Sequence, residues 1–89
     1  MNLIDFKQAT TGMDLKRELG FQTSEQLLPL RIVGRDGDLL LLDTNVDVPA
    51  TLGDLVALSN AALTLRVRHH QTIYPVYGYR IVASIIVLG

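Results

Sequence analysis

The sequence predicts a small, mainly β domain with one or two short helices, a β-rich member of the α+β class. A chain of 89 residues forms only one hydrophobic core, so residues 1–89 make a single domain. Asp36-Gly37 lies between two apolar runs, which is typical of a β-hairpin. Residues 63–68 alternate strictly between apolar and polar side chains, which is typical of a half-buried strand.

The first part of the chain carries helical signals. A threonine and an aspartate at the start, two leucines four residues apart and Gly20 at the end predict a short helix over residues 10–20. A second helical turn can begin at Ser24, and Pro29 interrupts it. Two helical segments joined by a turn also have the order of a helix-turn-helix, so a small duplex-DNA-binding regulator is one alternative function.

The middle of the chain predicts a hairpin and then becomes ambiguous. Residues 30–33 and 39–43 are the two expected strands, with the turn at residues 34–38. After a polar connector, Thr51 and Asp54 can form the capping box of a helix that runs to about Asn60. Alternatively, residues 53 and 54 form a turn that starts a strand over residues 55–58, and the local pattern does not decide between the two.

The last third predicts strands. Leu63, Leu65 and Val67 are expected to face the core, so the polar residues between them face outward. Residues 69–72 are the expected connection. The run 79–88 is rich in β-branched residues and predicts one long final strand.

Composition excludes several classes of protein. Without cysteine there are no disulfides, thiolate metal sites or catalytic thiols, and a reducing, cytoplasmic location is expected. We expect no secretory signal and no membrane contact, because the longest apolar run, 81–88, is too short to cross a bilayer. The sequence contains no nucleophile or phosphate-binding motif, so we expect no enzyme, cofactor or metal ion. A chain this small often oligomerises, and a homodimer is expected.

Charge is unevenly distributed along the chain. Residues 1–62 contain five basic and nine acidic residues, whereas residues 63–89 contain three arginines and no acid. The same segment holds both histidines and all three tyrosines. Guanidinium groups contact phosphates and aromatic rings stack on bases of any sequence, so this combination is typical of a site for single-stranded nucleic acid. The candidate binding residues are Arg66, Arg68, His69, His70, Tyr74, Tyr77, Tyr79 and Arg80.

The order of residues in the second half resembles a known family. Gly53-Asp54-Leu55-Val56, then Leu63 and Arg66, then Tyr79-Arg80-Ile81-Val82-Ala83, with Ile86 and Leu88-Gly89, is similar to the closing portion of the OB-fold single-stranded-DNA-binding proteins. Small relatives of that kind occur in phages and conjugative elements. The resemblance implies a five-stranded barrel, a strand rather than a helix over residues 53–58, and a binding groove beside Arg66, Arg68 and the hairpin tip at residues 69–77.

These observations predict a non-catalytic protein that binds single-stranded nucleic acid with a basic and tyrosine-rich strand face. The main alternative is a protein-interaction module, such as an inhibitor or assembly subunit from a phage or mobile element, in which tyrosine and arginine anchor a protein interface.

Overall fold

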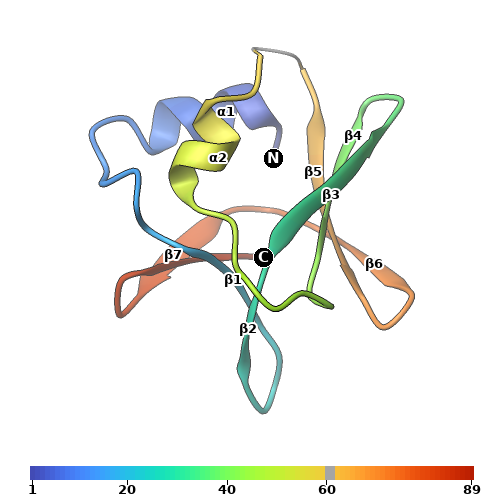
Figure 1. Ribbon diagram of the computed structural model, residues 1–89. Coiled ribbons are helices and arrows are strands. Elements are labelled where there is room, and N and C mark those ends of the chain that lie inside the picture. Colours follow the sequence, from blue (N-terminus) through green and yellow to red (C-terminus); the bar gives the residue numbers. More distant parts are fainter. Residues whose placement is uncertain (60–61) are drawn as a thin grey trace.

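The computed structural model describes residues 1–59 and 62–89 and confirms a mainly β fold with two short helices (Figure 1). Its strands form four hairpins, whose tips point outward in different directions. In chain order the elements are α1 (Leu3–Ala9), β1 (Leu19–Gln22), β2 (Leu27–Pro29), β3 (Arg31–Asp36), β4 (Leu39–Asp43), α2 (Leu52–Val56), β5 (Thr64–His69), β6 (Thr72–Pro75), β7 (Tyr79–Val82) and β8 (Ile85–Leu88).

The hairpins assemble into two four-stranded sheets. Sheet I has the order β2-β1-β8-β7 and therefore joins the first hairpin to the last, whereas sheet II, β3-β4-β5-β6, joins the second to the third. In each sheet the two central strands are parallel and the outer pairs are antiparallel. The chain passes between the sheets at Leu30 and again near Val76, and both side chains are buried. Burial of these two crossing points holds the sheets around one core.

The two helices lie side by side at one end of the molecule (Figure 1). Asn2 caps α1 by accepting a hydrogen bond from the Asp5 main-chain N–H at 2.8 Å, and the buried face of α1 presents Leu3 and Phe6 to the core. A capping box starts α2, because the Thr51 hydroxyl and the Asp54 carboxylate each accept from the main-chain N–H of the other residue. The segment is therefore a helix over Leu52–Val56, and the strand that the family resemblance implied there is wrong. Asn60 lies outside the described residues.

The helix predicted over residues 10–20 is wrong. Residues 10–18 form turns and extended chain, and β1 begins at Leu19. The main-chain carbonyls of Leu15 and Arg17 accept hydrogen bonds from the N–H groups of Gly53 and Leu52, at 2.9 and 2.8 Å. These long-range bonds tie the segment to the start of α2 and leave Leu15 55% exposed. Residues 24–28 also form no helix, so the helix-turn-helix alternative loses its structural basis.

Two strand predictions are confirmed and one is wrong. The central hairpin turns at Gly37 and Asp38, and β5 buries Leu65 and Val67 as its alternation predicts. The single final strand expected over residues 79–88 is instead the β7–β8 hairpin, because the chain reverses at Ala83, which has a φ of 55°. The described residues thus contain eight strands rather than five, in two sheets that do not close into one barrel.

Candidate functional site

The two arginines of β5 lie on the outer face of sheet II. Leu65 and Val67 are fully buried, and side chains alternate along a strand, so Arg66 and Arg68 point away from the core. This confirms the outward orientation that the sequence predicts for both arginines. Tyr74 lies opposite Val67 in β6 and therefore shares the inner face of the sheet. The arginines and Tyr74 are thus on opposite faces of the same pair of strands.

Arg68 is neutralised by an acidic neighbour. Its Nε and Nη2 atoms lie 2.7 and 2.5 Å from Oδ2 of Asp43, the residue opposite it in β4. Burial acts to raise the pKa of the Asp43 carboxyl, but the Asn45 main-chain N–H and the Arg68 guanidinium outweigh burial and hold that pKa below its ordinary value. Arg66 instead donates to the Leu65 carbonyl at 3.0 Å, and no ion pair involves it among the described residues.

An aromatic cluster forms where the two sheets meet. The ring of Phe21, in β1, lies 5.4 Å from the ring of Tyr74 and 6.0 Å from that of His69, in β6 and β5. His69 also contacts the ring of His70 at 4.0 Å, and its Nδ1 lies 2.7 Å from the Thr44 hydroxyl. Phe21 therefore brings two of the candidate residues, His69 and Tyr74, next to sheet I, and His70 joins the cluster through His69.

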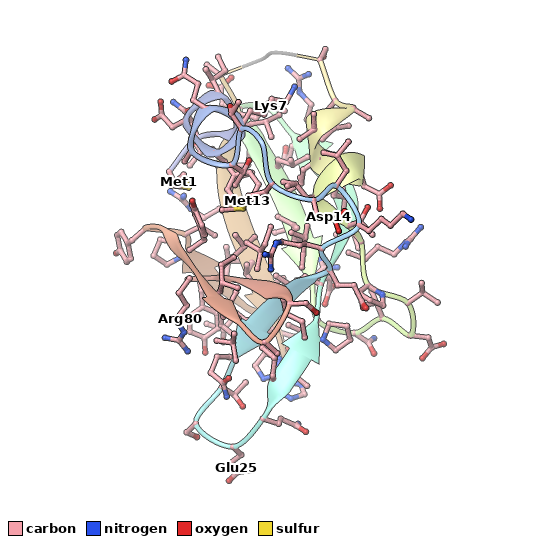
Figure 2. The ribbon with its side chains drawn as sticks, turned by 90° about the vertical axis from the view of Figure 1, so that its left-hand side faces the viewer. Met1, Lys7, Met13, Asp14, Glu25 and Arg80 are labelled. Atoms are coloured by element: carbon pink, nitrogen blue, oxygen red, sulfur yellow. The ribbon has the colours of Figure 1, made fainter. Side chains whose placement is uncertain are left out.

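An open groove of about 690 Å³ lies at the carboxyl ends of β1 and β8, beside the start of β7. Phe21 lines it, so the groove adjoins the aromatic cluster. Val87 and Leu88 of β8 also line the groove but are almost fully buried, whereas Tyr77 is 81% exposed. The Arg80 side chain extends outward from β7 (Figure 2). Polar side chains of the β1–β2 turn, Gln22, Thr23 and Ser24, complete the rim. The groove thus combines a cation, exposed aromatic surface and hydrogen-bonding groups.

Tyr79 makes its main contacts within the protein. Its ring packs edge-to-face against Phe6 of α1 at a centroid distance of 5.7 Å, and its hydroxyl donates to the Ala9 carbonyl at 3.1 Å. Both the flat ring and the polar tip are therefore used to dock α1 onto sheet I. Of the three candidate tyrosines, Tyr77 has the most ring surface available to a ligand.

The structure thus divides the eight candidate residues. His69, His70, Tyr74, Tyr77, Tyr79 and Arg80 lie at or next to the groove and its aromatic cluster, whereas Arg66 and Arg68 lie on the outer face of sheet II. Sequence reasoning missed Phe21, the residue that links these groups. Its position between a glycine and a polar run was the available signal, but its nearest aromatic neighbours are some fifty positions further along the chain.

In the described part of the chain, the fold and the groove define a small β protein of two sheets with an open site lined by aromatic residues. Within residues 1–59 and 62–89, no group of three or more histidine, aspartate or glutamate side chains is placed to hold a metal ion. No described helix has the length and apolar character needed to cross a membrane. The chain matches no protein-family model, no curated protein and no solved structure.

Proposed function

We propose that this chain is a non-catalytic protein that binds a short stretch of single-stranded nucleic acid in the groove between the β1–β2 turn and the start of β7. The observation that carries the proposal is Tyr77, whose side chain is 81% exposed at a groove that also presents Arg80. A tyrosine ring that is mostly exposed contributes little to packing within the fold. A flat ring beside a guanidinium can stack on a base while the cation contacts a phosphate.

The shape of the groove favours a single strand. A duplex hides its bases in the stack, so a protein reads it with an element inserted into the major or minor groove. The site here is concave and is lined by Tyr77, which is 81% exposed and suits an unstacked base. Gln22 and Ser24 at the rim can donate hydrogen bonds to phosphate or base edges, whereas the Thr23 hydroxyl already donates to the Gln26 carbonyl at 3.1 Å. Binding at this groove does not depend on the OB-like barrel that the resemblance implied.

The test is fluorescence anisotropy with a short labelled oligothymidylate over a series of salt concentrations. Tyr77→Ala should weaken binding by about 1–3 kcal/mol, the contribution of one stacked base. Arg80→Ala should weaken binding and reduce the slope of log affinity against log salt by about one. Arg66→Ala is the matched control, because it removes an arginine from the outer face of sheet II without touching the groove.

Two results would contradict the proposal. The first is no binding of the wild-type protein at low ionic strength, where phosphate contacts are strongest. The second is an equal loss of affinity in Arg66→Ala and Arg80→Ala, which would show attraction to overall positive charge rather than binding in the groove.

A further inference from the structure

The main-chain hydrogen bonds of β7 point alternately toward β8 and away from it. The Gly89 N–H donates to the Gly78 carbonyl at 3.2 Å, so these opposed residues form a hydrogen-bonded pair. Such pairs alternate in an antiparallel ladder, so Arg80 and Val82 are the next residues bonded to β8. The N–H and C=O groups of Tyr79 and Ile81 therefore point toward the open edge of sheet I.

A second main-chain hydrogen bond supports this alternation along β7. The Ile86 N–H donates to the Glu18 carbonyl, on the side of β1, at 2.9 Å. Ile86 lies opposite Ile81 in the β7–β8 pair. Because Ile86 directs its N–H away from β7, Ile81 has no hydrogen-bonding partner in β8, and no other strand of the described residues pairs with β7.

The other three sheet edges carry features that hinder pairing with another chain. Strand β2 ends in Pro29 and β6 in Pro75, and β3 has a bulge between Ile32 and Gly34. Proline removes a donor, and a bulge twists the edge away from a partner. Strand β7 has neither, and its Ile81 is 40% exposed. An unprotected edge with free main-chain groups and exposed apolar surface is typical of a strand that receives a partner.

We propose that the β7 edge binds an extended segment of another protein, which adds to sheet I as an antiparallel strand and carries an acidic residue opposite Arg80. The free groups of Tyr79 and Ile81 would form the hydrogen bonds of the new pair, and Ile81 would pack against an apolar side chain of the segment. This site rests on the free main-chain groups of β7 and not on the Tyr77 ring, although the Arg80 side chain belongs to both sites.

Charge favours an acidic partner over the self-pairing that opposes Tyr79 of one copy to Ile81 of the other. In an added antiparallel strand, Arg80 occupies a non-hydrogen-bonded position, where opposed Cα atoms are only about 4.5 Å apart. Self-pairing that uses Tyr79 and Ile81 of both copies would place Arg80 directly opposite Arg80. Like charges in that position are destabilising, whereas a carboxylate there would form an ion pair. Arg80 therefore disfavours this self-pairing and selects an acidic segment.

The experiment is selection of a displayed library of random peptides on the wild-type protein, followed by NMR titration of a selected synthetic peptide. We expect enriched peptides to alternate apolar and polar residues around one aspartate or glutamate. Binding should shift the amide signals of Tyr79 and Ile81 and slow their hydrogen exchange. N-methylation of the peptide at the residues paired with Tyr79 and Ile81 should weaken binding by about tenfold or more, because it removes main-chain donors.

Two protein variants sharpen the test. Ile81→Pro removes an edge donor, leaves the β7–β8 hydrogen bonds in place and should weaken peptide binding by about tenfold. Arg80→Glu should reject the acidic peptides and accept the same sequences with lysine at the acidic position, which a merely damaged fold would not do. Failure to enrich any peptide, or equal affinity for the N-methylated form, would overturn the proposal.

The outcomes for the two sites are separable. Tyr77→Ala should lose oligonucleotide binding and keep peptide binding, whereas Ile81→Pro should do the reverse. If the wild-type protein binds only the oligonucleotide or only the peptide, the result therefore counts against one proposal and leaves the other standing.

Discussion

Gly20 provides a quantitative test of the packing in sheet I. A methyl group at this position would lie 2.9 Å from Cγ2 of Ile85, 3.1 Å from Cδ1 of Leu27 and 3.2 Å from the Leu28 carbonyl oxygen. The two side-chain tips can shift, but the carbonyl belongs to β2, which is paired with β1 around this point. We expect Gly20→Ala to lower the free energy of unfolding by about 1–2 kcal/mol, since overpacking outweighs the smaller stabilisation from a less flexible unfolded chain.

Gly34→Ala is the matched control. It is also a strand glycine, but a methyl group there would meet nothing within 4 Å. We therefore expect Gly34→Ala to be neutral or to stabilise the protein by up to about 1 kcal/mol. Urea unfolding followed by circular dichroism measures both variants, and the Gly20→Ala midpoint should fall by about 1–2 M at a slope near 1 kcal/mol per M. Equal midpoints for the two variants would refute the packing around Gly20.

Two further predictions concern a turn and an ion pair. Ala83 has a φ of 55°, so Ala83→Gly should raise the thermal midpoint by relieving about 0.5–1 kcal/mol of strain, and an unchanged or lower midpoint would contradict this. Asp43 has a lowered pKa in the folded protein, so its ion pair with Arg68 stabilises the fold above pH 3.8, the ordinary value, and this contribution is lost as the pH falls through the lowered pKa. Urea midpoints at a series of pH values should show wild type and Asp43→Asn converging in acid, and a gap that widens in acid would exclude the pair as its cause.

The predictions that succeeded rest on interactions between residues close in sequence. The Asp36-Gly37 signal marked the central hairpin because its two-residue turn, Gly37-Asp38, uses the positive φ of 56° at Gly37. The alternation in β5 placed Leu65 and Val67 inside the core because a strand changes face at every residue. The capping box at Thr51, one of two alternatives that the sequence left open, likewise depends on a partner three residues away. In each case the physical cause lies within a few neighbouring residues of the chain.

The failures have causes elsewhere in the chain. Residues 10–20 have a helical pattern, but the carbonyls of Leu15 and Arg17 bond instead to the start of α2, a partner more than thirty residues away. The reversal at Ala83 has no local signature, because primed hairpin turns normally use glycine or asparagine at positive φ. The Arg17 guanidinium contacts the Ser84 carbonyl at 3.3 Å, so part of what fixes this turn also comes from a distant segment.

Pairing between strands far apart in the sequence also explains why only part of the candidate site could be predicted. Aromatic and basic residues in the last third of the chain indicated a binding surface, but the groove exists only because the first hairpin joins the last through the parallel pair of β1 and β8. That pairing places Phe21 opposite Leu88 and the β1–β2 turn beside Tyr77. If the groove binds an oligonucleotide as proposed, a substitution that weakens β1–β8 pairing should impair that binding even where it touches no ligand. By contrast, the local alternation of β5 is enough to predict where Arg66 and Arg68 lie, which is the outer face of sheet II and not the groove.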